Sequence, residues 1–251
     1  YVSEEQRWES ILERNLNNSN LQGAYQVFNG GVSGNHTLHS ILNLIAKVIP
    51  LKPDYTVLMH NVNDLTVLRQ TGSYWNATKS RSLMKIETNE TLFLIARQLK
   101  DLLIPNIYPF VKRQIPEKDE FAKTRSQDNH KIDVIENEFR SALITFITVG
   151  QSWNIEPILM TQYNRIKLND GLFVRVYNDT NIEEYVNKYH RLNEVIRDVG
   201  SNYNIDVIDL ATLVPRSSDY LYDAVHLNDA GSLYVADILS NFWLSKLKVS
   251  K

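Results

Sequence analysis

The sequence of 251 residues contains no cysteine. Without a thiol, the chain can form no disulfide, build no thiolate zinc site and use no cysteine nucleophile. The absence says little about the cellular compartment, because cytoplasmic and exported bacterial proteins alike can lack cysteine. The localisation therefore stays open between these two.

The sequence also lacks a large excess of charge of either sign and any long apolar run. The formal net charge is −2, and the basic residues are scattered. This balance disfavours a nucleic-acid partner. No apolar run approaches the length of about 20 residues that a membrane-spanning helix needs, and no stretch has the pattern of a signal peptide. The sequence starts at Tyr1 rather than Met, so we expect further residues before it in the natural protein.

Strand and helix patterns alternate along the chain. Apolar residues make up 43% and charged residues 22%, which is ordinary for a globular protein, and the length suits a single domain over residues 1–251. The patterns predict strands at 24–28, 55–59, 157–161 and 205–210, and helices at 4–17, 37–48, 91–103, 128–149, 182–199 and 229–247. The alternation predicts an α/β fold of three layers, with a mostly parallel sheet between helices.

The remaining segments are expected to be less regular. Residues 66–88 and 162–180 are interpreted as a loop or lid and as an irregular polar segment, and 105–126 as a surface excursion. At the start of the chain, Ser3 and Gln6 have the spacing of a capping box.

Polar residues follow three of the predicted strands. A glycine-rich turn that ends at Gly34 follows the first strand, and the turn Asn61-Val-Asn63-Asp64 follows the second. The pattern Asp223-x-x-His226 follows the last strand. Because ligands of open α/β sheets bind beyond the carboxyl ends of the strands, we expect these segments to share one site.

Each segment alone has an ordinary explanation. The glycines can be turn residues, Asp64 can cap the next helix, and Asp223 and His226 can be a surface pair. Together they provide complementary chemistry. An aspartate beside a histidine holds one imidazole tautomer and stabilises its cation, while the Gly34 N–H and the Asn63 carboxamide can donate to a developing oxyanion.

The three segments resemble the second, third and fifth conserved blocks of the SGNH/GDSL hydrolases, in the same order and over nearly the whole chain. The resemblance implies a flavodoxin-like architecture and a serine nucleophile. It also implies that Gly34 and Asn63 are oxyanion donors, His226 the general base and Asp223 the residue that orients it. One position departs from the family pattern, because Asn61 stands where the third block usually begins with glycine.

A second departure concerns the nucleophile. The first block of the family carries the serine just before a helix like the one predicted at 4–17, and this sequence begins at that helix. We therefore expect the serine and its strand to lie upstream of Tyr1. Ser33 is interpreted as a turn serine, because Gly31-Val-Ser33-Gly34-Asn35 lacks the last glycine of a nucleophile elbow. Ser82-Leu-Met-Lys85 matches Ser-x-x-Lys without companion motifs.

The resemblance predicts a serine esterase that hydrolyses ester groups, foremost O-acetyl groups, on small or carbohydrate substrates through an acyl-enzyme. Two alternatives stay open: an O-acyltransferase in which a sugar hydroxyl replaces water, and an inactive protein that binds a glycan or a partner. Tyr74 and Trp75 can form a rim that stacks on sugars or belong to an ordinary packed loop. We expect no metal, because the histidines do not have the spacing of metal ligands. We expect no cofactor, because the sequence has neither a phosphate-binding loop nor a dinucleotide-binding motif. The oligomeric state stays open.

Overall fold

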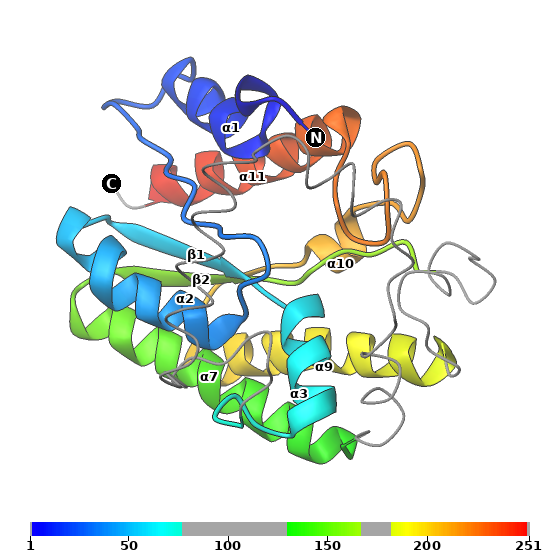
Figure 1. Ribbon diagram of the computed structural model, residues 1–251. Coiled ribbons are helices and arrows are strands. Elements are labelled where there is room, and N and C mark those ends of the chain that lie inside the picture. The colour runs from blue at the N-terminus through cyan, green and yellow to red at the C-terminus, as the bar shows by residue number, and fades with distance from the viewer. Residues whose placement is uncertain (1, 77–129, 167–181, 250–251) are drawn as a thin grey trace, which may run out of the picture.

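The computed structural model describes residues 2–76, 130–166 and 182–249 of the chain. Within them, a parallel sheet in the order β1-β2-β3 lies between two layers of helices (Figure 1). The strands are β1 (Tyr55–Met59), β2 (Glu156–Met160) and β3 (Val207–Ile208). All five residues of β1 pair in parallel with those of β2. The structure thus confirms the predicted α/β class with a parallel sheet.

The helices divide between the two faces of the sheet (Figure 1). One face is covered by α1 (Trp8–Asn17) and α11 (Asp229–Val249). The other is covered by α2 (Thr37–Asn43), α3 (Val62–Thr71), α7 (Ile132–Ser152) and α9 (Ile182–Tyr203). Shorter helical pieces are η1 (Glu4–Gln6), η2 (Leu44–Val48), η3 (Ile49–Leu51) and α10 (Leu210–Leu213). Among the helices of the described residues, none is long and apolar enough to cross a membrane.

Strand β2 supplies both halves of the core. Ile158 and Met160 are buried in the cluster formed with α1 and α11, whereas Leu159 is buried in the cluster formed with α2, α3, α7 and α9. Successive side chains of a strand point to opposite faces. An almost continuous apolar run therefore suits this strand, because helices cover it on both sides.

The helix expected at 4–17 begins later than predicted. Residues Glu4–Gln6 form a separate 3-10 turn, and Arg7 is extended at φ −69° and ψ 144° before α1 begins at Trp8. The Ser3 hydroxyl donates to the side-chain oxygen of Gln6 at 3.1 Å and caps no backbone N–H. The predicted capping box is therefore wrong, because its two side chains bind each other instead of the helix terminus.

The strand expected at 24–28 is also wrong, since this segment pairs with no strand of the described residues. Side chains of α1 accept hydrogen bonds from its backbone N–H groups instead. The Asn17 carboxamide oxygen accepts from the N–H of Tyr25 at 2.9 Å, and the Glu13 carboxylate accepts from that of Val27 at 2.7 Å. The extended segment therefore follows α1, and β1 forms one edge of the described sheet.

In the middle of the chain, α3 extends to Thr71, so the loop expected from residue 66 is wrong at its start. Gly72, at φ 68°, ends the helix in the left-handed conformation that glycine adopts most readily. The helix expected at 91–103 and the excursion at 105–126 lie outside the described residues, as do parts of 66–88 and 162–180.

The remaining predictions differ mainly at their ends. The helix expected at 37–48 is α2 continued by the π-helical turn η2, while α7, α9 and α11 each run past the predicted last residue. The strand expected at 205–210 is shorter, because Leu210 already opens the four-residue helix α10.

Candidate active site

The loop between α10 and α11 brings Asp223 and His226 together. The Nδ1 atom of His226 lies 2.7 Å from Oδ2 of Asp223. The other carboxylate oxygen, Oδ1, accepts the backbone N–H groups of Val225 at 2.9 Å and His226 at 2.8 Å. An aspartate that binds the backbone two and three residues ahead forms a tight turn, which fixes its position. Because a carboxylate only accepts, Nδ1 carries the proton and Nε2 keeps its lone pair.

The surroundings keep Asp223 ionised. Partial burial alone would raise its pKa, but hydrogen bonds from the Val225 N–H and from the side chain and N–H of His226 outweigh it and hold the pKa below the usual value. The imidazole itself faces solvent, with 63% of the His226 side chain exposed. The pair thus combines a fixed negative charge with an accessible ring nitrogen, as a general base requires.

A short hairpin holds this pair in place. Leu221 and Leu227 form an antiparallel bridge, and the N–H of Tyr222 donates to the His226 carbonyl at 3.0 Å. The Tyr222 ring stacks on the imidazole, with 5.6 Å between centroids and 11° between planes. Sequence reasoning missed Tyr222, for which proximity to the Asp-x-x-His pattern was the only signal.

Arg165, shortly after β2, braces the same loop from the neighbouring segment. Its Nε donates to the Asp223 carbonyl at 2.8 Å, and its backbone N–H donates to the Ala224 carbonyl at 2.9 Å. Sequence reasoning missed this residue too, because nothing local to it in the sequence indicates a contact 58 residues away.

The two predicted oxyanion donors lie on adjoining segments. Gly34 has φ +80°, a conformation that favours glycine, and the Asn35 N–H closes its turn on the Val32 carbonyl at 3.1 Å. The Asn63 carboxamide, in the first turn of α3, donates to the Asn35 carbonyl at 2.7 Å. The structure therefore joins the glycine turn to the Asn63 side chain.

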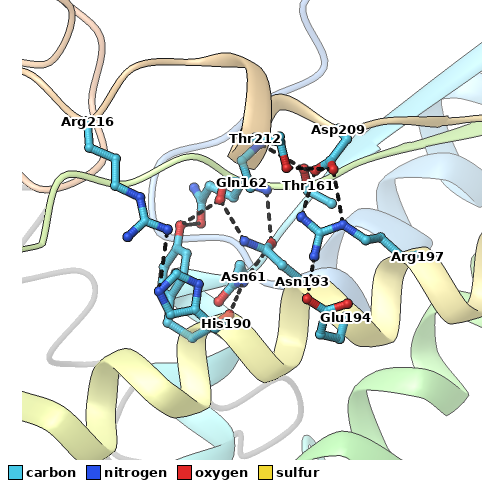
Figure 2. A network of polar contacts seen from close by, with 12 residues as sticks. Asn61, Thr161, Gln162, His190, Asn193, Glu194, Arg197, Asp209, Thr212 and Arg216 are labelled. Carbon is cyan, nitrogen blue, oxygen red and sulfur yellow. Dashed lines mark hydrogen bonds and ion pairs between the residues drawn. The ribbon is translucent and has the colours of Figure 1, made fainter.

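Asn61, which stands at the glycine position of the family pattern, has a structural role (Figure 2). Its buried carboxamide donates to the Tyr189 carbonyl and to the Asn193 side-chain oxygen, each at 2.9 Å. Its φ of −167° lies outside the left-handed region that favours glycine. The position therefore does not require a glycine, and asparagine anchors the end of β1 to α9.

Gln162 continues this network (Figure 2), and its segment links the two parts of the candidate site. Its side-chain oxygen accepts the N–H of Val62 at 2.9 Å, beside Asn63, and its backbone N–H and carbonyl both bind the Asn193 carboxamide. Since Arg165 lies three residues further on, one segment after β2 holds both the start of α3 and the loop of Asp223.

A second group of contacts in Figure 2 fixes the residue that follows β3. Two guanidinium nitrogens of Arg197 donate to the Asp209 carboxylate at 2.8 and 3.1 Å, and the Thr161 hydroxyl donates to it at 2.7 Å. Partial burial would raise the pKa of Asp209, but the hydrogen bonds from Arg197, Thr161 and Thr212 lower it. These bonds fix where the chain leaves the sheet toward the loop of His226.

Asp64 caps a different helix from the one expected. Its Oδ1 accepts the N–H of Thr37, the first residue of α2, at 2.9 Å, and it also accepts the hydroxyl of Tyr74. Tyr74 is therefore buried, and its proposed place in an exposed sugar-stacking rim is wrong. Trp75, by contrast, is 70% exposed.

Other polar residues give no sign of a metal centre. Among residues 2–76, 130–166 and 182–249, no group of three or more metal-ligating side chains comes together. The N–H of His36 donates to Nδ1 of His39 at 3.3 Å, so these two histidines belong to the start of α2. Ser82 lies outside the described residues.

The model of the GDSL-like lipase/acylhydrolase family matches residues 1–233. The chain belongs to this family, which agrees with the blocks around Gly34, Asn63 and Asp223-x-x-His226. It is accordingly a carboxylic ester hydrolase by class. No curated protein matches the sequence.

Solved structures with a similar fold are hydrolases. LAE5, an alpha/beta hydrolase enzyme from the metagenome of Lake Arreo, is 14% identical with a TM-score of 0.54, over 93% of this chain and 79% of its own. A catalytic mutant of Axe2, an acetylxylan esterase from Geobacillus stearothermophilus, is 13% identical with a TM-score of 0.54, over 93% of this chain and 78% of its own. At these identities the comparison establishes the shared fold.

Proposed function

We propose that the protein is a serine esterase that removes O-acetyl groups from small or carbohydrate substrates. One observation carries the proposal: Nδ1 of the exposed His226 imidazole is bound to an Asp223 carboxylate fixed by its own turn. This arrangement leaves Nε2 to take and return a proton at the surface of the loop.

The residues divide the reaction between them. The serine oxygen attacks the ester carbonyl while His226 Nε2 takes its proton, and Asp223 stabilises the imidazolium that forms. The Gly34 N–H and the Asn63 carboxamide donate to the oxyanion. The alcohol leaves with the proton from His226, and water, activated by the same imidazole, then releases acetate from the acyl-enzyme.

The nucleophilic serine, in this proposal, precedes Tyr1. Two observations on the described residues support that position. The Ser232 hydroxyl, near the start of α11, donates to the Gln6 carbonyl at 2.7 Å, so the beginning of the chain lies beside the helix that follows His226 (Figure 1). In addition, β1 has an apolar sequence and no strand partner on one side within the described sheet, where a further strand can pair.

One structural relative and one exposed side chain support an acetylated sugar as the substrate. Axe2, which shares the fold, is an acetylxylan esterase. In this chain, the bond from Tyr74 to Asp64 ties residue 74 to the first turn of α3, and the adjacent Trp75 exposes an apolar ring. We propose that this ring contacts the sugar that carries the acetyl group.

The test uses the protein with its native residues before Tyr1. Hydrolysis is measured for p-nitrophenyl acetate, butyrate and octanoate and for acetylated xylo-oligosaccharides. We expect the highest kcat/KM on acetyl esters, and a phosphonofluoridate adduct on a serine upstream of Tyr1. Faster hydrolysis of octanoate contradicts the acetyl preference, and full activity after substitution of that serine contradicts the proposed nucleophile.

A further inference from the structure

Three residues on different elements approach one another on the α2 side of the sheet. The hydroxyl oxygen of Ser40, in α2, lies 2.7 Å from Nε2 of His60, which directly follows β1. The other ring nitrogen of His60, Nδ1, lies 3.5 Å from Oδ2 of Asp64 in α3. A hydroxyl at one imidazole nitrogen and a carboxylate at the other is the order of a Ser–His–Asp relay.

The carboxylate is placed to fix the imidazole tautomer. Its Oδ1 accepts the Thr37 N–H and the Tyr74 hydroxyl, so Asp64 cannot turn away. Its Oδ2 is buried with no hydrogen-bond partner among the described residues, and faces His60 Nδ1. A carboxylate can only accept, so Nδ1 carries the hydrogen and Nε2 accepts from the Ser40 hydroxyl. The 3.5 Å gap is long for a resting hydrogen bond, and the positive charge formed on His60 during proton transfer draws the pair together.

The hydroxyl of Ser40 differs in its partner from those of three other helical serines. A serine inside a helix commonly binds the carbonyl four residues earlier. Ser141, Ser152 and Ser240 do so, at 2.8, 2.6 and 2.7 Å. Ser40 directs its hydroxyl to an imidazole instead. A nucleophile and base within about 2.6–3.2 Å, with the base oriented by a third group, form the arrangement that activates a serine.

The carboxylate of the three groups is buried, whereas the imidazole and the serine are partly exposed. Asp64 is fully buried, the His60 side chain is 14% exposed, and Ser40 is partly exposed. Burial lowers the pKa of His60, although the Asp64 charge acts in the opposite direction. The lowered pKa favours the neutral imidazole, which can accept a proton from the partly exposed Ser40.

We propose that Ser40, His60 and Asp64 form a second Ser–His–Asp relay, in which Ser40 is a nucleophilic serine that takes acyl groups from activated esters. The Ser40 oxygen attacks the ester carbonyl carbon, and its proton passes to His60 Nε2. The bond from the carbonyl carbon to the phenolic oxygen then breaks, and the phenolate takes the proton from His60 and leaves as the phenol. The product is acyl-Ser40 with His60 neutral again. This site is independent of Asp223 and His226.

The experiment treats the folded full-length protein with p-nitrophenyl acetate and, separately, with a phosphonofluoridate probe, and maps the modified peptides by mass spectrometry. We expect a stoichiometric adduct on Ser40 with either reagent. His60→Gln, which keeps a polar side chain, should slow formation of this adduct about 10²-fold or more, in line with the loss of a positioned general base. Ser40→Ala should remove it. Asp64→Asn, an isosteric change, should slow it less than His60→Gln.

Two further variants separate this site from other serines. Ser141→Ala makes the same substitution at a helical serine whose hydroxyl binds only a backbone carbonyl. This variant should leave the Ser40 adduct unchanged. His226→Ala should also leave it, whereas esterase turnover in the proposed function depends on His226. An adduct on Ser40 that forms at the same rate in His60→Gln, or no adduct on Ser40 in folded protein, overturns the second relay without touching the proposed esterase site.

Discussion

The Nε atom of Arg165 lies 2.8 Å from the carbonyl oxygen of Asp223. Arg165 belongs to the segment after β2, and its contact therefore couples the sheet to the loop that carries the Asp223–His226 pair. Gln162, in the same segment, binds the backbone next to Asn63. In this account, a small displacement of the segment moves the base and one oxyanion donor relative to each other.

Replacement of Arg165 by methionine should therefore lower kcat about 10- to 100-fold, because loss of the brace lets the loop leave its productive position. KM should change less, since Arg165 contacts the loop backbone. Arg191→Met is the matched control, because Arg191 pairs with Glu136 between α9 and α7. Steady-state kinetics with p-nitrophenyl acetate compare the two. Equal activity of both variants would contradict a positioning role.

Asp223→Asn should lower kcat by about 10⁴-fold with little change in stability. The carboxamide can donate to Nδ1, which favours the wrong imidazole tautomer and leaves the imidazolium without a counter-charge. The measurement is kcat alongside a urea unfolding curve, which separates lost chemistry from lost folding. A variant that keeps a tenth of the wild-type kcat would show that Asp223 does not orient the base.

Asn63→Ala should reduce kcat about 10²- to 10³-fold through loss of an oxyanion donor. Because its carboxamide also holds the Asn35 carbonyl, the variant should be slightly less stable as well. Asn137→Ala, which alters an exposed asparagine of α7, controls for the loss of a helical asparagine. A fall in KM and kcat by the same factor would argue against a donor that acts in the transition state.

Gly231→Ala should destabilise the protein by about 1–3 kcal/mol. A methyl group at this position would lie 2.0 Å from the Tyr220 carbonyl oxygen, so the start of α11 and the hairpin that carries Asp223 and His226 would have to separate. Gly30→Ala is the control, because a Cβ there meets nothing within 4 Å. Urea unfolding of both variants measures the difference. Equal stability would show that the hairpin tolerates displacement.

Ionisation of Asp209 should make the free energy of unfolding depend on pH in the acidic range. Its pKa is lower in the folded protein than in the unfolded chain, where it is about 3.9. The stabilisation is therefore fully present above about pH 4 and is lost as the pH falls through the folded pKa. Asp209→Asn should flatten the fall in unfolding free energy as the pH decreases below about 4. Since the carboxylate is partly exposed, the effect is reduced by solvent. If the unfolding free energy of Asp209→Asn falls as steeply with decreasing pH as that of the wild type, Asp209 does not contribute to the acid dependence.

Features encoded over a few residues could be predicted from the sequence. The strand at 55–59 follows from an apolar run with proline before it, and the Asp223–His226 contact follows from a spacing that a single turn can close. The capping box at Ser3 and Gln6 had a local pattern too, but the extended Arg7 separates it from the helix.

Features that depend on distant partners could not be predicted. The segment 24–28 has the composition of a strand, yet α1 side chains take up its N–H groups. Asn61 meets Asn193 across 132 residues of sequence, and Ser40 meets His60 only because α2 packs near the end of β1. No period or motif marks such pairs, since they arise from packing between elements.

The role of His226 as the general base is tested most directly by kcat/KM for p-nitrophenyl acetate, measured in protein that carries its native residues before Tyr1 and in its His226→Ala variant. His190→Ala, which alters a histidine on α9 next to Arg216, serves as the control. We expect a loss of at least about 10³-fold for His226→Ala and near wild-type activity for His190→Ala. Wild-type activity in folded His226→Ala would contradict the proposed base and the site built around it.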